Sequence, residues 1–282
     1  MATLLMGYDI ECAAIGEGLA QLGAEVEPYR LALNPQTTRE GLEIIEQVHT
    51  ELRAPATLFV CGRTLTHAPD AIRARSENPL FDIQQHTYSH VLFKNQPWQE
   101  ITFSASPPQA ISQELAFTRQ LIEQSLGSSC IGLLTPFGYY EGLRGRPDLL
   151  APLAENGIQY VSSWGRNSEG GNPTPWVQPF RYEEEGFPGI LEIPFQFWLD
   201  ALWFSTYGFD QGVQFRKVLC GAIDEIVQKD LVYGVCFHDW AMVAFQEQRT
   251  GWVHGLLEYA LQKGVSVMSY TQYHASFNDK AR

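Results

Sequence analysis

The stretch Thr3–Glu11, TLLMGYDIE, decides the fold prediction, because it reads as a buried strand that ends in two acids. Side chains alternate along a strand, so Asp9 and Glu11 are expected on one side while Ile10 points to the other. One of these carboxylates can hold a metal ion while its neighbour stays free as a base. An acidic strand end can also simply cap a helix, so the pair needs support from the rest of the chain.

Strand-like apolar runs alternate with amphipathic helical patterns along the remaining sequence. The expected strands are Thr3–Ile10, Pro55–Cys61, Phe81–Gln84, Ile131–Thr135, Ile158–Ser163, Ile190–Phe195, Val232–Phe237 and Val265–Ser269. The expected helices are Arg39–Arg53, Pro107–Leu126, Asp148–Asn156, Gly212–Lys229 and Thr250–Lys263. This alternation predicts an α/β fold, a distorted (β/α) barrel of about seven to eight parallel strands. We expect a single domain over residues 1–282.

Several residues predict where helices begin and end. Thr37 with Glu40 has the pattern of a capping box, and Ser106 precedes two prolines as an expected N-cap. Helix stops are expected at three glycines, Gly127, Gly157 and Gly264.

Composition excludes several classes of partner. The chain has 282 residues, 45% of them hydrophobic, and a net charge of −13 from 19 basic and 32 acidic residues. That charge argues against binding to nucleic acid or an anionic membrane. The five cysteines are odd in number and scattered, as in a reducing compartment. The sequence shows no signal-peptide pattern and no apolar stretch long enough to span a bilayer, so we expect a cytoplasmic protein and leave oligomerisation open.

Histidines follow two of the expected strands. His86 and His90, in HTYSH, are spaced to lie on one face of a helical turn, close enough to chelate one cation. His238 ends the late run Val232–Phe237, although a lone histidine there could equally be a core residue. In barrels of this kind, reactive groups collect at the carboxyl ends of the strands. The acids and all three histidines follow strand ends, which predicts a shared site.

The chain resembles the NodB-like polysaccharide deacetylases, the fourth family of carbohydrate esterases, over almost its whole length. His86–His90 is similar to the family's H-[ST]-x-x-H metal motif, and GLLTPFG at Gly132–Gly138 to its groove strand. Three further segments, Ala54–Gly62, Tyr160–Ser163 and Val235–His238, resemble the family's strands in the family's order.

The resemblance implies a distorted (β/α) barrel and metal-dependent hydrolysis of an N-acyl group. Asp9 would be the base, His86 and His90 metal ligands, and His238 the general acid. The backbone N–H of Phe137, in the groove segment, would bind the oxyanion of the tetrahedral intermediate.

The chain departs from the family pattern in three places. The spacing Asp-Ile-Glu resembles the intracellular branch with allantoinase-like and lipid-sugar deformylase-like members, which gives Glu11 the third ligand role. Leu134 stands where the family usually has an arginine that orients the base, so Arg144, Arg146 or Arg166 would have to replace it. The usual acid after the strand at Tyr160–Ser163 is missing. Asp200 could take its place by orienting His238, with Asp239 as the rival.

These features predict a hydrolase that removes an acetyl or formyl group from a small N-acylated amino sugar or related amide. The cofactor is a divalent metal, with Zn²⁺ as first choice for two histidines and a carboxylate. Aromatic residues such as Trp164 and Trp240 are expected to line the substrate pocket, and the excursion Gly165–Gly189 to close over a compact ligand rather than over polymeric chitin or peptidoglycan. Three alternatives remain open: an allantoinase-like cyclic-amide hydrolase, a non-haem iron oxygenase, and a catalytically dead barrel that binds a glycan.

Overall fold

The computed structural model describes residues 1–12, 14–15, 34–98, 101–208, 210–244 and 251–280. Its strands are β1 Thr3–Ile10, β2 Ala56–Val60, β3 Phe81–Gln85, β4 Gln96–Trp98, β5 Ile101–Phe103, β6 Gly132–Tyr139, β7 Tyr160–Trp164, β8 Phe180–Tyr182, β9 Phe187–Glu192, β10 Val232–His238 and β11 Ser266–Met268. Its helices are α2 Pro35–Leu52, α3 Gly62–His67, α4 Pro69–Ser76, α5 Pro108–Leu126, α6 Pro147–Glu155, α7 Asp200–Tyr207, α8 Gly212–Lys229, α9 Asp239–Ala244, α10 Gly251–Gln262 and α11 Tyr270–Lys280.

The main sheet is mostly parallel, which confirms the predicted α/β class. Its strands follow the order β10-β1-β2-β3-β6-β7-β9-β8, with β11 also paired to β1. Within this sheet the described pairings are parallel except for that of β8 with β9. The short strands β4 and β5 form a separate antiparallel hairpin.

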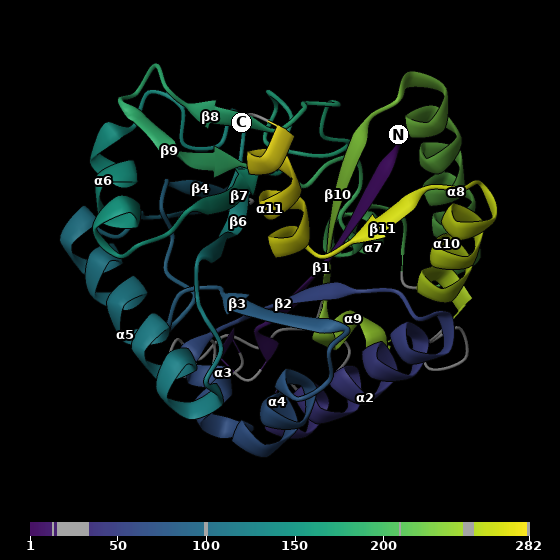
Figure 1. The fold of residues 1–282 in the computed structure, drawn as a ribbon, viewed down its shortest axis with the longest axis horizontal. Helices are drawn as coiled ribbons and strands as arrows, with labels where there is room; N and C mark the ends of the chain where they lie inside the picture. The colour runs from purple at the N-terminus through teal and green to yellow at the C-terminus, as the bar shows by residue number, and fades with distance from the viewer. Residues whose placement is uncertain (13, 16–33, 99–100, 209, 245–250, 281–282) are drawn as a thin grey trace.

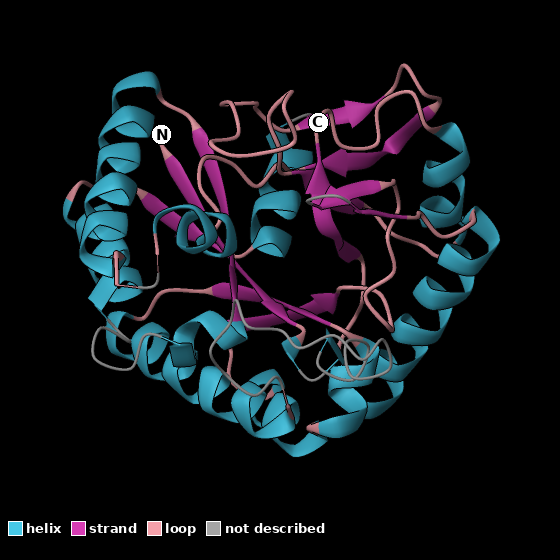
Figure 2. Cartoon of the chain, turned by 180° about the vertical axis from the view of Figure 1, so that it is seen from behind, coloured by secondary structure: helices cyan, strands magenta, loops and turns pink. Residues whose placement is uncertain are grey.

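The two ends of this sheet approach each other. Phe195, just beyond β9, forms an isolated parallel bridge with Gly234 of β10, and Gln196 N–H donates to the Gly234 carbonyl at 2.8 Å. The sheet therefore curves toward a barrel, with strands gathered in the centre and long helices along the outside (Figures 1 and 2). In Figure 2 the upper side is formed by loops and by β8 and β9.

Both faces of β1 are buried, because helices cover the outer face and the curved sheet encloses the inner one. On the outer face, Leu4 and Met6 belong to the cluster that includes residues of α2, α8 and α10. On the inner face, Leu5 packs in a cluster with Phe59 of β2 and Tyr270 of α11. Apolar packing thus fills the inside of the sheet below the level at which Asp9 points inward.

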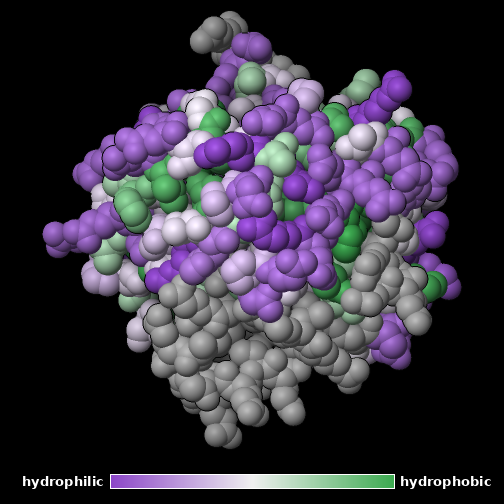
Figure 3. Space-filling model, turned by 90° about the horizontal axis from the view of Figure 1, so that it is seen from below, coloured by the Kyte–Doolittle hydropathy of each residue, from purple (hydrophilic) through white to green (hydrophobic). Residues whose placement is uncertain are grey.

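The surface is mainly polar. The face seen in Figure 3 carries mostly hydrophilic residues, with small separate hydrophobic areas outside the grey atoms. Among the helices that the structure describes, none is both long and apolar enough to cross a membrane.

Helix boundaries follow local chemistry, with two corrections to the sequence prediction. The N-cap of α2 is Asn34, whose side chain accepts from Gln36 N–H at 2.9 Å and Thr37 N–H at 3.1 Å, so the capping-box assignment was wrong. Pro107, rather than Ser106, is the N-cap of α5. The predicted stop at Gly127 is confirmed by its left-handed φ of 68°.

Replacement of Gly234 by alanine tests the close approach between the sheet ends. A Cβ at Gly234 would lie 2.4 Å from the Pro194 carbonyl oxygen and 2.8 Å from the Tyr270 hydroxyl. We expect Gly234→Ala to lower the free energy of unfolding by about 1–3 kcal/mol through overpacking. The matched control is Gly221→Ala in α8, where a Cβ meets nothing within 4 Å; it should gain up to about 1 kcal/mol. Urea denaturation measures both, and equal effects would contradict this account.

Candidate active site

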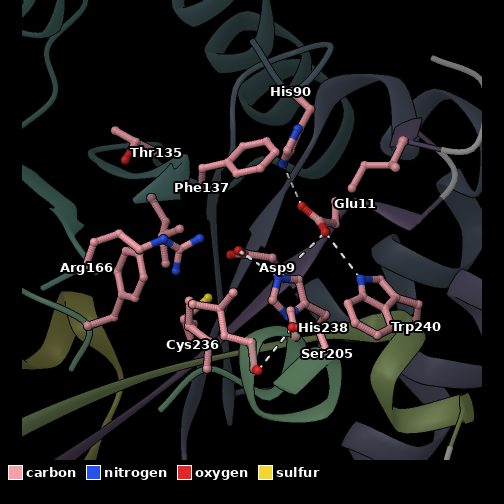
Figure 4. Close-up of a pocket in the computed structure, with 16 residues that line it drawn as sticks. Asp9, Glu11, His90, Thr135, Phe137, Arg166, Ser205, Cys236, His238 and Trp240 are labelled. Carbon is pink, nitrogen blue, oxygen red and sulfur yellow. Dashed lines mark hydrogen bonds and ion pairs between the residues drawn. The ribbon is translucent and has the colours of Figure 1, made fainter. Parts of the chain in front are cut away.

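The acid pair at the end of β1 lies where the sequence placed it. Asp9 and Glu11 are 4% and 3% exposed. Parallel pairing sets Asp9 opposite His238 of β10, and the other neighbour of β1 is β2, with Ile10 opposite Val60. Parallel strands end at a common edge, so side chains far apart in sequence converge there (Figure 4).

His86 and His90 converge on the same edge, but not from a helical turn as predicted. They lie in the loop after β3, where Thr87 and His90 have left-handed φ values of 60° and 64°. Glu114 of α5 holds this loop by accepting from Tyr88 N–H at 2.8 Å and from Ser89 N–H at 2.7 Å. The two imidazole centroids are 5.0 Å apart, so the loop achieves the proximity that we had expected from a helix.

Glu11 is the centre of the charged cluster. Its Oε2 lies 2.8 Å from His90 Nε2 and 3.2 Å from His86 Nε2, and its Oε1 accepts from Trp240 Nε1 at 3.3 Å. Burial alone would raise the pKa of Glu11, but His90, His238 and His86 together hold it well below its usual range. The carboxylate is therefore ionised.

The donor set fits a divalent metal ion. His86 Nδ1 donates to the Leu134 carbonyl at 2.7 Å. Because a carbonyl only accepts, Nδ1 keeps its proton, and Nε2, which faces Glu11, is the nitrogen that can bind a metal once it has lost its proton. Two groups in the described part of the chain bring three ligand atoms within 4.8 Å of one another. They are Glu11 with His86 and His90, and Glu11 with Asp9 and His238. The first has the two-histidine, one-carboxylate composition typical of zinc.

Asp9 lies beside this donor set rather than at its centre. Its Oδ2 is 3.6 Å from His86 Nε2 and 3.8 Å from His238 Nε2, and its buried Oδ1 has no hydrogen-bond partner. Burial raises the pKa of Asp9 above its usual value, against the opposing effect of His86 and His238. A carboxylate with a raised pKa and a free oxygen suits a general base.

Of the two acids considered as partners of His238, Asp200 is the one that holds it. His238 Nδ1 donates to Asp200 Oδ1 at 2.5 Å, and its backbone N–H donates to Asp200 Oδ2 at 2.9 Å. Burial lowers the pKa of His238, but the charge of Asp200, with Glu11 and Asp9, raises it overall to about 10. The ring is therefore protonated at neutral pH and presents Nε2 toward the two acids of β1.

Asp239, the rival of Asp200, has a structural role. It accepts from Cys12 N–H at 3.2 Å and from the Thr38 hydroxyl of α2 at 2.9 Å. Its Oδ1 also receives the Glu11 N–H at 3.5 Å. Asp239 thus fixes the backbone that carries Glu11, and burial raises its pKa to about 7.

The cluster opens onto a cavity of about 110 Å³ with mixed walls. Asp9, Glu11, His90, His238, Trp240 and Arg166 contribute the polar groups (Figure 4). The apolar wall includes Ile15, Leu134, Phe137, Phe195, Leu199 and Leu202. Phe137 has a left-handed φ of 72°, and its ring centroid lies 5.6 Å from that of His90.

Two predictions about this pocket were wrong. Trp164 is not among the lining residues; its ring packs against Tyr140 and Phe180. Within the excursion Gly165–Gly189, only Arg166 lines the cavity, and Trp176 instead stacks on Phe197 at 5.5 Å. The wall opposite the loop with His86 and His90 comes from the segment 195–205.

The arginine candidates also separate in the structure. Arg166 is buried and lines the cavity. Arg144 lies 4.2 Å from the Phe180 ring centroid, and Arg146 pairs with Asp148 at 2.7 Å on the surface. Of the three candidates, Arg166 is therefore the one that lies at the cavity.

Sequence reasoning missed Glu114, which carries no motif and acts through loop amides 25 and 26 residues away. Its position on the inner side of α5, near the loop with His86 and His90, is set by tertiary packing alone. Thr38 was missed for the same reason, since its link to Asp239 joins residues 201 positions apart.

Comparisons with known proteins agree with this fold. The family model described as polysaccharide deacetylase matches residues 35–160. A structure described as a polysaccharide deacetylase from Mycobacterium smegmatis has a TM-score of 0.69 at 15% identity, covering 99% of this chain and 91% of that one. One from Pseudomonas aeruginosa PAO1 has a TM-score of 0.71 at 16% identity, covering 97% and 89%.

The crystal structure of Puue allantoinase is equally similar, with a TM-score of 0.71, 17% identity and coverage of 97% of this chain and 89% of that one. No curated protein matches the sequence significantly. The family match over residues 35–160 and the shared fold confirm the predicted resemblance to the polysaccharide deacetylases. An allantoinase has this fold as well.

Proposed function

We propose that this protein is a metal-dependent hydrolase of carbon–nitrogen amide bonds. The observation that carries the proposal is the convergence of Glu11, His86 and His90 beside two groups suited to acid–base work, Asp9 and His238. A divalent ion, Zn²⁺ in the first place, held by those three ligands would supply Lewis acidity and a water of lowered pKa.

Asp9 would act as the general base. Its Oδ1 lies free in the site, and its raised pKa makes it a better proton acceptor than an exposed aspartate. In the reaction, Asp9 takes a proton from the attacking water while the water oxygen bonds to the amide carbonyl carbon. The backbone N–H of Phe137, at the cavity wall, would stabilise the resulting oxyanion.

His238 would act as the general acid. Its Nδ1 is held by Asp200, so that Nε2 carries the proton into the site. Transfer of this proton to the amide nitrogen lets the C–N bond break and the amine leave, since an amine anion is a poor leaving group. Asp200 is a positioning residue, because it acts on the ring of His238 and not on the substrate.

The site favours hydrolysis over the alternatives. An oxygenase needs open positions at its metal but has no use for a base and a charged acid beside it. A dead barrel would not need Asp9 and the His238–Asp200 pair buried together. Cyclic-amide hydrolysis is the second candidate, supported by the structural similarity to an allantoinase. The cavity of about 110 Å³ suits a small acetylated or formylated amine better than a polymer.

Metal content tests the ligand assignment. We expect about one divalent ion per chain, lost in His86→Ala and in His90→Ala because each removes one of three protein ligands. The control His254→Ala changes a partly exposed histidine that pairs with Glu51 at 3.3 Å and should keep the ion. Elemental analysis is the measurement. An unchanged metal content in the His86→Ala, His90→Ala double variant would contradict the ligand assignment.

Activity tests the roles of Asp9 and His238. On a panel of N-acetylated and N-formylated amines, Asp9→Asn and His238→Ala should each lower kcat by about 10²–10⁴ while metal content stays near that of the wild type. Release of acetate or formate gives the rate. If Asp9→Asn loses the metal and Glu11→Gln keeps it, the two acids have exchanged roles.

The pH profile tests Asp200. His238 must be protonated to act, so activity is present below its pKa and falls as the pH rises through it. Asp200 raises the pKa of His238, so Asp200→Asn should move the alkaline limb of kcat/KM to lower pH. Asp148→Asn, a surface acid paired with Arg146, is the control and should leave the limb in place. A lower rate without any displacement of the limb would refute the positioning role.

A further inference from the structure

Arg166 is a buried cation that faces the cavity without an acidic partner. Arg166 is only 6% exposed. Nη1 donates to the Gly165 carbonyl at 3.3 Å, and Nε is buried without a hydrogen-bond partner. Among the described residues, no carboxylate lies within 4.0 Å of its guanidinium, although surface arginines such as Arg39 and Arg146 have such partners.

This burial is costly unless an anion compensates it. Taking a guanidinium out of water without a partner opposes folding. Burial lowers the pKa of Arg166 only to about 10, so the side chain keeps its charge at neutral pH. The structure thus maintains a positive charge without an acidic partner at the wall of the cavity.

The cavity lies between Arg166 and the acids. The guanidinium points into it from the side away from Glu11, toward Asp9 (Figure 4). Asp9 and Arg166 each retain a buried polar atom without a partner, Oδ1 and Nε, yet they form no ion pair with each other. A ligand group between them can satisfy Arg166 while the reacting amide lies near Asp9 and His238.

We propose that Arg166 binds a carboxylate on the substrate, at the end of the cavity away from Glu11. This rests on the proposed function and narrows its substrate class to amides that carry a carboxylate near the hydrolysed bond. A guanidinium binds a planar carboxylate through two parallel N–H donors. The small volume of the cavity and its apolar lining residues, among them Leu134 and Phe195, favour a carboxylate over a bulkier phosphate.

Anion binding tests the proposal without requiring catalysis. The probes are ¹³C-acetate and inorganic phosphate, titrated by NMR into the full-length His86→Ala, His90→Ala variant, so that a metal cannot bind the anion. We expect acetate to bind this variant. When Arg166→Gln is introduced as a third substitution, the affinity for acetate should fall by about tenfold or more. Added Arg144→Gln is the matched control and should leave acetate affinity unchanged, because Arg144 lies over Phe180 and outside the cavity.

The outcomes separate this proposal from the proposed function. The proposal is overturned if acetate does not bind, or if Arg166→Gln leaves the affinity for acetate unchanged. If phosphate binds more tightly than acetate, the choice of a carboxylate is overturned. Acetate inhibition of the metal-loaded enzyme, weakened in Arg166→Gln, gives a second readout if the histidine variant does not fold. Loss of kcat on neutral N-acetylglucosamine with unchanged acetate affinity makes Arg166 a positioning residue for Asp9 instead. An inactive protein that still binds acetate through Arg166 contradicts only the proposed function.

Discussion

The parallel pairing of β1 with β10 is the constraint on which the rest of the site depends. Its register sets Asp9 directly opposite His238, and alternation along β1 then gives Glu11 the same orientation as Asp9. On the other side, β2 and β3 bring the loop with His86 to the same level, because His86 N–H donates to the Val60 carbonyl at 3.0 Å. A shift of one residue between β1 and β10 would turn one partner away from the other.

The burial of the charged cluster is explained better by the reaction we propose than by a contribution to folding stability. Asp9, Glu11, His86 and Asp200 are almost completely buried, and buried ion pairs add little net stability because desolvation offsets their attraction. Each group instead shifts the pKa of its neighbours in a useful direction. Glu11 is held ionised for a ligand role, Asp9 becomes a stronger base, and His238 keeps its proton.

The sequence predicted eight of the described strands, but not the short β4, β5 and β8. It also predicted the main residues of the site, because both follow from local patterns. Residues 3–10 and 212–229 form the predicted strand and helix with unchanged bounds, and the acids and histidines follow strand ends as expected. Contacts that depend on tertiary packing could not be predicted. The loop geometry at His90, the support from Glu114 and the packing of Trp164 away from the cavity are set by neighbours distant in sequence. Asp200 was found only through the family resemblance, since an acid that begins a helix has no distinctive local pattern.

The contact between α2 and the end of β10 has a mechanical consequence. A Cβ at Gly41 of α2 would lie 2.3 Å from the carbonyl oxygen of Asp239, the first residue of α9 directly after β10, so the two backbones touch there. On this side of the site the two backbones therefore have no room to move closer together. Of the described walls, the segment at Leu199–Ser205 is half-exposed at Ala201 and Leu202, and this segment also carries Asp200 at the start of α7. A displacement of this short helix would therefore move the cavity wall and Asp200, the partner of His238, together.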